Sequence, residues 1–298
     1  MDGIICIDKP GEHTSFDVVA RVRGILRQRK VGHGGTLDPM ATGVLPVFLG
    51  TATRCCDILP NERKAYLAAA QLGAATDTQD CCGRISERIA GHVTEAALRE
   101  AMRAFEGGYL QRPPMYSAIQ VGGQRLYDLA RQGAEVEREK RPVTLYRMEL
   151  LEFNEPEQRF TLQVECGKGT YVRTLCEDIA RQAGSAAYLL SLRRTMSAGF
   201  TLPDCVSLEE LTALAAEGRV GERLLPPERA FLDLPRAYLS PKQAHLLKNG
   251  VKLSADRLKC QADSGRVSVY GWQEGFLAVA ELNPESRLLE RVKLFCAR

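Results

Sequence analysis

Apolar and polar positions alternate clearly in one stretch of this chain, from Arg159 to Cys166. Phe160, Leu162 and Val164 fall on one face there, which predicts a half-buried β-strand. Shorter apolar segments predict further strands at 4–7, 44–50 and 64–73. The alanines of the last segment would also suit a helix. Pro46 lacks a backbone donor, which predicts that strand 44–50 lies at a sheet edge or a bulge.

A second pattern, with apolar residues three and four positions apart, predicts helices. The first begins at Ser15, where Thr14 and Asp17 have the spacing of a capping box, and runs to about Gln28. The others are expected at 94–105, 125–132, 174–183 and 241–249. Strands and helices therefore mix along the first two-thirds of the chain, which is the pattern of an α/β (α+β) protein.

The last third of the chain has a different pattern. Three prolines between Leu224 and Pro235 indicate a linker. Beyond it, apolar segments predict strands at 267–270, 276–282 and 288–295. We therefore expect a large first domain at 1–225, a linker at 226–235 and a small β-rich domain at 236–298.

Composition excludes several classes of protein. Apolar residues make up 45% and charged residues 26% of the chain, which is ordinary for a globular protein. No apolar run is long enough to span a membrane and no export signal is evident, so we expect a cytoplasmic protein. Ten cysteines without a C-x-x-C pair and only four histidines predict reduced thiols and no zinc site. With a net charge of only +3, any nucleic-acid-binding face has to come from local clusters of cations.

The first candidate site is the glycine loop, Gly32-His33-Gly34-Gly35-Thr36-Leu37-Asp38-Pro39. Its three glycines in four positions let the backbone approach a ligand closely. Pro39 pushes Asp38 into an extended conformation, which displays one carboxylate on a stiff loop. A reaction centre fits this arrangement, and so does an ordinary turn in which the aspartate caps a neighbouring amide.

Three further segments carry candidate chemistry. Residues 111–142, here called the insertion, mix arginines and lysines with tyrosines, which suits either contact with phosphates and bases or an ordinary surface loop. Cations also cluster at 21–30, where a solvated helix face is the simpler explanation. Residues 167–173 join a strand to a helix through glycines and bring Tyr171 and Arg173 to that turn. Their spacing is not that of a nucleotide-binding P-loop.

These segments closely resemble the motifs of the TruB family, the bacterial tRNA pseudouridine-55 synthases. The resemblance is strongest in the glycine loop and its continuation to Pro46. It extends, in the family's order, to residues 8–10, 64–66, 77–80, 112–118, 167–173 and 192–194. The motifs together span roughly residues 3 to 200. The C-terminal part resembles a PUA domain in size and strand pattern only.

The resemblance implies the pseudouridine-synthase fold, a mixed, largely antiparallel sheet with flanking helices, followed by a PUA-like RNA-binding domain. It implies isomerisation of uridine 55 in the T loop of tRNA, in which the N1–C1′ bond is cut and the ribose is rejoined through C5. Such enzymes need no metal and no cofactor, and the target base has to leave its stack. The expected partner is the T arm of tRNA. We expect the protein to be a monomer and not to bind a membrane. Phosphate contacts are expected from cations at 21–30, 112–141 and 193–194.

The resemblance also implies roles for single residues. Asp38 matches the catalytic aspartate, a nucleophile, and Arg173 would pair with it and keep it ionised. Tyr171 would contact the base and take part in proton transfer at C5. The other expected substrate-binding residues are Tyr66 stacked on the base, Leu192 in the pocket wall, His33 at the RNA where the base has left the stack, and Lys9 with Pro10 in the pocket floor. Whether Asp38 attacks the base or C1′, or acts through a glycal intermediate, stays open.

Other interpretations remain at this level. A non-catalytic tRNA-binding or tRNA-folding chaperone would share the basic and aromatic surfaces, but would not need Asp38 with Arg173. A hydrolase could use residues 33–35 as an oxyanion loop, but the chain has no G-x-S-x-G motif to supply the nucleophile. A guide-RNA-dependent relative is disfavoured because the chain shows no long basic tail.

Overall fold

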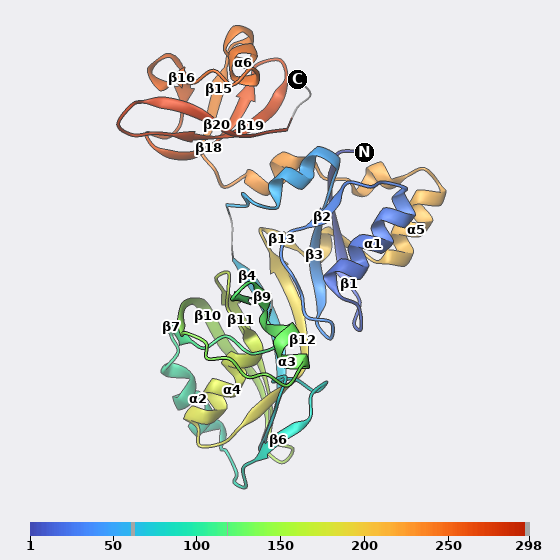
Figure 1. The fold of residues 1–298 in the computed structure, drawn as a ribbon, viewed down its shortest axis with the longest axis vertical. Helices are drawn as coiled ribbons and strands as arrows, with labels where there is room; N and C mark the ends of the chain where they lie inside the picture. The colour runs from blue at the N-terminus through green and yellow to red at the C-terminus, as the bar shows by residue number, and fades with distance from the viewer. Residues whose placement is uncertain (61–62, 118, 296–298) are drawn as a thin grey trace.

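The computed structural model describes residues 1–298 except for 61, 62, 118 and 296–298. Ala118, in the motif 112–118, and the last three residues of the expected C-terminal domain therefore lie outside the described residues. Figure 1 shows a larger part built on a ten-stranded sheet and a smaller part built on a six-stranded sheet.

The larger sheet follows the order β14-β1-β3-β12-β4-β11-β10-β7, with β2 beside β3 and β13 beside β12. Its strands are β1 (Gly3–Lys9), β2 (Val31–His33), β3 (Thr42–Leu49), β4 (Lys64–Leu72), β7 (Gly107–Gln111), β10 (Arg141–Asn154), β11 (Arg159–Cys166), β12 (Ala187–Ser197), β13 (Phe200–Thr201) and β14 (Cys205–Val206). The pairs β1–β14 and β3–β12 are parallel, and the other pairs are antiparallel. The expected mixed, largely antiparallel sheet is therefore confirmed.

The five predicted helices are present, with ends that differ by a few residues. The helices are α1 (Ser15–Leu26), α2 (Glu95–Arg103), α3 (Leu126–Arg131), α4 (Val172–Gln182), α5 (Leu208–Ala216) and α6 (Pro241–Lys248). The capping box of α1 forms as predicted, and the helix ends before Gln28 because Arg27 adopts a left-handed conformation with φ 48°. Of these helices, α5 had not been predicted.

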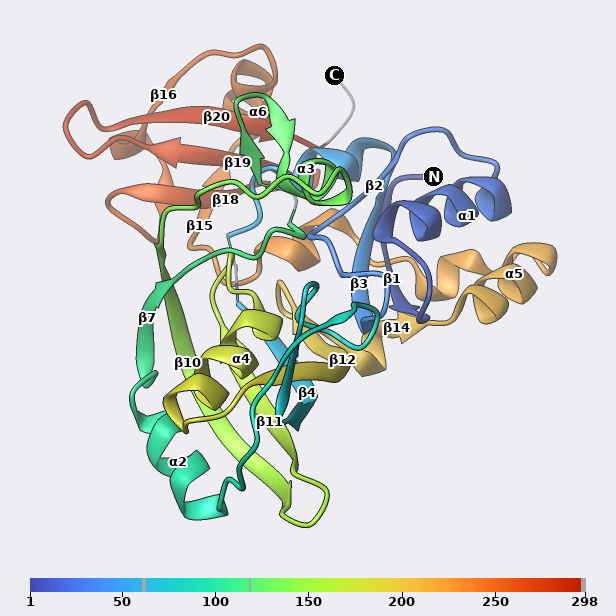
Figure 2. The ribbon, with the colours of Figure 1, turned by 60° about the horizontal axis from the view of Figure 1, so that its bottom comes forward.

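Apart from the strands of the smaller sheet, the remaining elements are short. They are the hairpins β5 (Ala74–Thr76) with β6 (Ile85–Arg88) and β8 (Gln120–Val121) with β9 (Gln124–Arg125), and the 3₁₀ turns η1 (Gly50–Cys55), η2 (Leu202–Asp204), η3 (Val220–Arg223), η4 (Pro227–Phe231) and η5 (Ala255–Arg257). The insertion leaves the sheet at the end of β7 and returns at the start of β10, and it carries β8, β9 and α3 (Figure 2).

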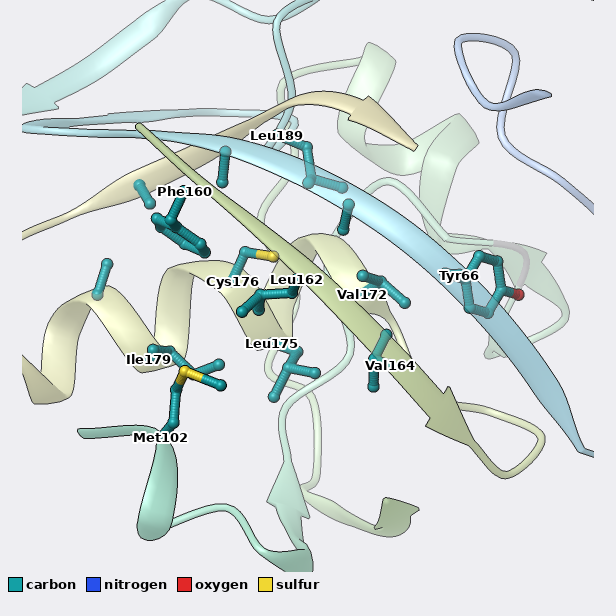
Figure 3. Close-up of a cluster of buried hydrophobic side chains, with 14 of the residues drawn as sticks. Tyr66, Met102, Phe160, Leu162, Val164, Val172, Leu175, Cys176, Ile179 and Leu189 are labelled. Carbon is teal, nitrogen blue, oxygen red and sulfur yellow. The ribbon is translucent and has the colours of Figure 1, made fainter. Parts of the chain in front are cut away.

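Helices cover the larger sheet in two groups. α2 and α4 pack on strands β4, β11 and β10, whereas α1 and α5 pack on strands β1 and β3 (Figures 1 and 2). The alternation predicted for β11 is confirmed, because Phe160, Leu162 and Val164 are buried against α4 (Figure 3). This packing matters for function because it fixes the first turn of α4 against the sheet.

Strand β3 lies in the interior of the sheet, so the expectation that Pro46 marks an edge or a bulge is wrong. On the side of β3 away from β1, β12 pairs only at Thr42 and Gly43, and β2 pairs only from Val47 onward. Pro46 lies between these stretches, where its carbonyl accepts a hydrogen bond from the Gly34 N–H (2.9 Å). Proline is tolerated because no ladder needs its missing donor there.

The smaller sheet follows the order β16-β20-β19-β18-β15-β17 and is β-rich, as expected for the C-terminal part. Its strands are β15 (Arg236–Leu239), β16 (Leu253–Ser254), β17 (Lys259–Cys260), β18 (Gly265–Gly271), β19 (Gly275–Leu282) and β20 (Leu288–Leu294). Helix α6 packs on this sheet, and the two enclose a hydrophobic core of their own.

The segment expected as a linker is packed between the two sheets. Leu225, directly before this segment, exchanges two backbone hydrogen bonds with Ile4, with N–O distances of 2.7 and 2.8 Å. Phe231, in η4, is buried in a cluster that joins Phe48 of β3 to Phe295 after β20. Residues 1–225 therefore do not enclose all of their own core, because this cluster draws on both sheets. The domain limits at 225 and 236 stay a prediction.

Candidate active site

The glycine loop is fastened to strand β3 and to the start of helix α1. Besides the bond from Gly34 to Pro46, the Ser15 hydroxyl at the start of α1 accepts a hydrogen bond from the Leu37 N–H (2.8 Å) and donates to the Leu37 carbonyl (3.2 Å). Gly35 has φ +105°, and a Cβ on Gly34 would come within 2.8 Å of the Phe48 ring. Glycine is required at both positions, and the loop is stiff because its backbone groups are already bound.

Arg194, at the end of the family-like segment in β12, holds the same loop from inside the protein. Its side chain has no exposed surface. Nε donates to the Val44 carbonyl (2.7 Å), Nη1 to the Thr36 carbonyl (3.2 Å) and Nη2 to the Gly35 carbonyl (3.2 Å). The rigid fork of the guanidinium therefore fixes the backbone just before Asp38.

This burial corrects one of the expected RNA-binding clusters. Arg194 cannot reach a phosphate, because its donors are used on main-chain carbonyls inside the protein. Arg193 points the other way and forms an ion pair with Asp8, at 2.7 Å between Nη2 and Oδ2. Of the two cations expected to bind RNA at 193–194, Arg194 therefore has a structural role instead. The two adjacent arginines differ because successive side chains of β12 point to opposite faces of the sheet.

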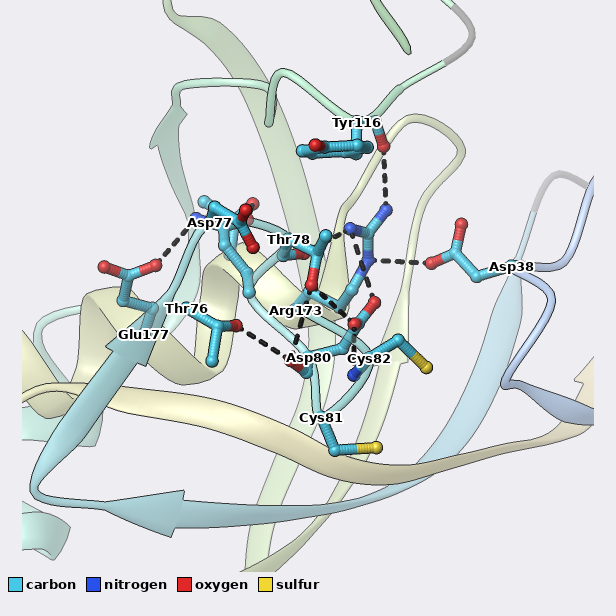
Figure 4. Close-up of polar contacts among 12 residues, drawn as sticks. Asp38, Thr76, Asp77, Thr78, Asp80, Cys81, Cys82, Tyr116, Arg173 and Glu177 are labelled. Carbon is cyan, nitrogen blue, oxygen red and sulfur yellow. Dashed lines mark hydrogen bonds and ion pairs between the residues drawn. The ribbon is translucent and has the colours of Figure 1, made fainter. Parts of the chain in front are cut away.

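Asp38 and Arg173 form the ion pair that the resemblance implied (Figure 4). Arg173 Nε lies 2.8 Å from Asp38 Oδ2, and the Asp38 side chain is 34% exposed whereas that of Arg173 is 4% exposed. The Nε–H bond does not point at the oxygen, so the contact is an ion pair rather than a linear hydrogen bond. The carboxylate can thus meet a substrate while the cation stays inside the protein.

Three groups from two other segments orient the Arg173 guanidinium. Nη1 donates to the Thr78 carbonyl (2.6 Å) and Nη2 to the Tyr116 carbonyl (3.0 Å). Asp80 Oδ2 lies 3.8 Å from Nη1 (Figure 4). The arginine therefore links the glycine loop to the 77–80 motif and to the start of the insertion.

Asp80 is a residue of the site that sequence reasoning did not assign. Its side chain is buried, and it accepts hydrogen bonds from the Thr78 hydroxyl (2.6 Å) and the Cys82 N–H (3.0 Å). Such partners, and the cation beside them, offset the cost of taking a carboxylate out of water. The signal in the sequence was the match at 77–80, which placed a carboxylate in a family motif without saying what it contacts.

Lys9 supports the glycine loop from below, and its ammonium group is buried. Nζ donates to the Pro10 carbonyl (2.8 Å) and to the Pro39 carbonyl (3.0 Å), directly after Asp38. Burial lowers the pKa of Lys9 to about 8, and the nearby Asp38 charge opposes that shift. The structure thus places Lys9 and Pro10 at the loop that carries Asp38. The sequence had led us to expect both residues in the pocket floor.

Two tyrosines lie within electrostatic reach of Asp38. Burial raises the pKa of Tyr66 to about 12, and the Arg194 charge acts against this shift. Burial also raises the pKa of Tyr171, and Asp38 adds to the effect at both residues. The Tyr66 ring is buried in the core with Leu192 (Figure 3), whereas Tyr171 is half-buried just before α4. Both phenols therefore stay protonated at neutral pH.

His33 lies at the end of β2, half-buried, and burial together with the Arg194 charge lowers its pKa. It is therefore a neutral imidazole at pH 7. The structure brings Asp38, Arg173, Lys9, Tyr66 and Tyr171 together. His33 is on the strand that enters the loop.

Among the residues that the structure describes, no group of three or more His, Cys, Asp or Glu side chains is placed to hold a metal ion. None of the helices in this part of the chain is both long enough and apolar enough to cross a bilayer.

The chain matches two family descriptions. Residues 23–172 match "TruB family pseudouridylate synthase (N terminal domain)", and residues 173–232 match "tRNA pseudouridylate synthase B C-terminal domain". A protein of Dehalococcoides mccartyi strain CBDB1 named tRNA pseudouridine synthase B is 45% identical over 288 residues, which are 96% of this chain and 93% of the relative. A Clostridium tetani protein of the same name is 43% identical over 259 residues, covering 87% of this chain and 88% of the relative.

Two solved structures are similar over nearly the whole chain. A chain in the crystal structure of a Cbf5-Nop10-Gar1 complex superposes with a TM-score of 0.79 at 26% identity, covering 99% of this chain and 85% of that one. A chain in the structure of an H/ACA RNP bound to a substrate RNA containing 2′-deoxyuridine gives a TM-score of 0.78 at 25% identity, covering 99% and 86%. The overall fold thus recurs in both of these chains, and the second belongs to an RNP bound to a substrate RNA.

Proposed function

This chain belongs to the TruB family of pseudouridylate synthases, and on that premise we propose that it converts uridine 55 in the T loop of tRNA to pseudouridine. It is an isomerase that acts on tRNA. At the level of chemistry, the ion pair between Asp38 and Arg173 carries the proposal. A protein that only folds tRNA would gain nothing from a half-exposed carboxylate in its RNA-binding site, because that charge repels phosphates.

Access to the base is the first requirement. A uridine stacked in the T loop cannot reach a carboxylate on a stiff loop, so it leaves the stack at a cost of about a few kcal/mol. The insertion supports the exit of the base from the stack. Its first segment is held at the site by the hydrogen bond that Arg173 donates to the Tyr116 carbonyl. We assign His33 to the RNA where the base has left, Leu192 to the pocket wall and Tyr66 to contact with the base.

The reaction is an isomerisation, so its atoms balance without a co-substrate. The N1–C1′ bond breaks, C5 bonds to C1′, the proton on C5 leaves and N1 gains a proton. Asp38 is the nucleophile in this scheme, and its carboxylate is held at Oδ2 by Arg173. Tyr171, whose hydroxyl stays protonated because burial raises its pKa, contacts the base and relays the proton at C5. Lys9 and Pro10 keep the floor of the loop in place.

The T arm of tRNA is the proposed partner, recognised by a cytoplasmic monomer. Exposed cations of the insertion, Arg112, Arg131, Lys140 and Arg141, suit its phosphates, and so do Arg21, Arg27, Arg29 and Lys30 around the end of α1. We assign the smaller sheet, with α6, to a PUA-like domain that holds the acceptor side of the tRNA without entering the chemistry.

An unmodified tRNA transcript incubated with the purified protein alone tests this function. We expect one pseudouridine, at position 55, and none when that uridine is replaced by cytidine. Leaving out any guide RNA or second protein separates a stand-alone enzyme from one that needs an H/ACA-like assembly. Pseudouridine that forms only after such components are added, or that forms at another position, would contradict the proposal.

Salt dependence tests where the RNA lies. Replacing the exposed cations Arg112, Arg131, Lys140 and Arg141 by glutamine should flatten the slope of log K against log[salt] by roughly 0.7 to 0.9 for each phosphate that the protein no longer neutralises. Arg99 and Arg103 are the matched control, because they are exposed on α2 and paired with Glu95 and Glu100. An unchanged slope in the insertion variant would mean that the RNA binds another face.

A further inference from the structure

Gln111, the last residue of β7, is buried with 1% of its surface exposed and holds the main chain of Tyr171. Its Oε1 accepts a hydrogen bond from the Tyr171 N–H (2.8 Å), and its Nε2 donates to the Tyr171 carbonyl (3.0 Å). Tyr171 is the N-cap residue of α4, and its own side chain makes no capping hydrogen bond. Gln111 therefore supplies a partner for one of the N–H groups that a helix leaves open at its start.

A chain of hydrogen bonds fixes the direction of the Gln111 amide. Nε2 also donates to the Tyr109 hydroxyl (2.6 Å), and that hydroxyl donates to Asp178 Oδ2 (2.7 Å). A reversed amide would set Oε1 against the Tyr171 carbonyl, oxygen to oxygen. Asp178 lies about two turns along α4 from Tyr171, so the network joins β7 to α4 at two points. Burial raises the pKa of Tyr109, which keeps its hydroxyl a donor.

We infer that Gln111 is a positioning residue for the isomerisation, because it sets the main chain that carries Tyr171 and, two residues later, Arg173. This inference rests on the proposed function and adds a residue to its site. Misplacing a reacting group by about 1 Å can lower a rate about 100-fold. The first turn of α4 places both the group assigned to the proton relay and the cation beside Asp38, so a small shift there moves both.

The position of Gln111 in the chain gives this clamp a second consequence. Gln111 is the first residue of the insertion, so the strand that contacts α4 through Gln111 continues directly into the segment whose exposed cations are proposed to bind the T arm. If the insertion moves when RNA binds, two hydrogen bonds from Gln111 would therefore transmit that movement to the start of α4.

The chain offers a matched control for this clamp. Gln158 Oε1 accepts from the Val93 N–H (2.8 Å), and its Nε2 donates to the Val93 carbonyl (3.0 Å), which repeats the arrangement of Gln111 on Tyr171. It lies in the turn between β10 and β11, six residues from Val164, the partner of Tyr66 in the sheet. At about 3.3 Å per residue of strand this is roughly 20 Å from Tyr66.

The test compares Gln111→Met with Gln158→Met in steady-state kinetics on tRNA, alongside thermal unfolding. Each variant loses three side-chain hydrogen bonds, two of which bind the main chain of one residue, so both should unfold at a lower temperature. At saturating tRNA, Gln111→Met should lower kcat by about 10- to 100-fold with KM changed by less than about threefold, and Gln158→Met should keep its kcat. An unchanged kcat in folded Gln111→Met protein, or an equal loss in both variants, would overturn the inference.

Two further measurements keep the inference testable on its own. In a double-mutant cycle, Gln111→Met should cost much less in kcat when Tyr171→Phe is already present, and fully multiplicative losses would show that Gln111 does not act through Tyr171. Amide hydrogen exchange needs no turnover, so it separates this inference from the proposed function. Exchange at Tyr171 should speed up in Gln111→Met and not in Gln158→Met, and unaltered exchange in both would overturn the clamp. If Gln111→Met does not fold, Gln111→Glu is used, which keeps the acceptor and removes the donor.

Discussion

Asparagine in place of Asp38 should abolish turnover while leaving tRNA binding intact. The substitution keeps the shape of the side chain and one acceptor oxygen, but it removes the charge and the nucleophilic oxygen pair. No neighbour replaces them, because Thr36 is a weak nucleophile without a base and Lys9 is used on main-chain carbonyls. We expect kcat to fall by at least about 10⁴-fold, the scale seen when a reacting group is removed from other enzymes.

Asp8→Asn is the matched control for this prediction. Asp8 is 36% exposed and paired with Arg193 at 2.7 Å, and Asp38 is 34% exposed and paired with Arg173 at 2.8 Å. The two substitutions therefore remove the same charge from carboxylates of similar exposure, each paired with an arginine; the Asp8 pair is bidentate and its arginine is 39% exposed, whereas Arg173 is 4% exposed. We expect Asp8→Asn protein to keep most of its turnover, and the tRNA affinity of both variants to stay near that of the parent. Near-normal pseudouridine formation by Asp38→Asn protein, purified from cells without the host enzyme, would refute the mechanism.

Arg173→Lys should be the second most damaging change. Lysine keeps the positive charge, but a single ammonium group cannot reach Asp38 and the carbonyls of Thr78 and Tyr116 together. Each buried carbonyl left without a donor costs about 1–3 kcal/mol of stability. We expect a fall in kcat of about 10²- to 10³-fold, because the group that orients the nucleophile is lost, together with a lower unfolding temperature.

Arg181→Lys controls for an arginine on the same helix. Arg181 is paired with Glu87 and Glu177 at the surface of α4, so its replacement should change neither kcat nor the unfolding temperature by much. Measuring kcat at a temperature where both variants are fully folded separates catalysis from stability. If Arg173→Lys protein turned over like the parent, charge alone would be sufficient and the multiple contacts would be irrelevant to the rate.

Much of the local structure of this protein was determined by local sequence. The alternation at 159–166 gave the bounds of β11, and the Thr14–Asp17 box gave the start of α1, because both depend on neighbours within a few residues. The glycine loop gave Asp38, since the turn chemistry of Gly, Asp and Pro is local as well. Arg173 and Tyr171 came from a family motif rather than from any local rule.

Only the tertiary structure decided which side chains complete the site. Arg193 and Arg194 are identical neighbours in sequence, yet one pairs with Asp8 at the surface and the other is buried against the glycine loop. Pro46 indicates an edge strand, yet β3 lies in the interior of the sheet. The proline is tolerated there because neither β12 nor β2 pairs with β3 at this position.

The contacts that join distant segments follow the same rule. Asp80 reaches Arg173, and Gln111 reaches Tyr171, across more than fifty positions of the chain. Local sequence determines the conformations that a segment can adopt, since sterics and hydrogen bonds within a few residues set them. It does not determine the partner of a buried polar group, because that partner is chosen by which strands and helices the whole chain brings side by side.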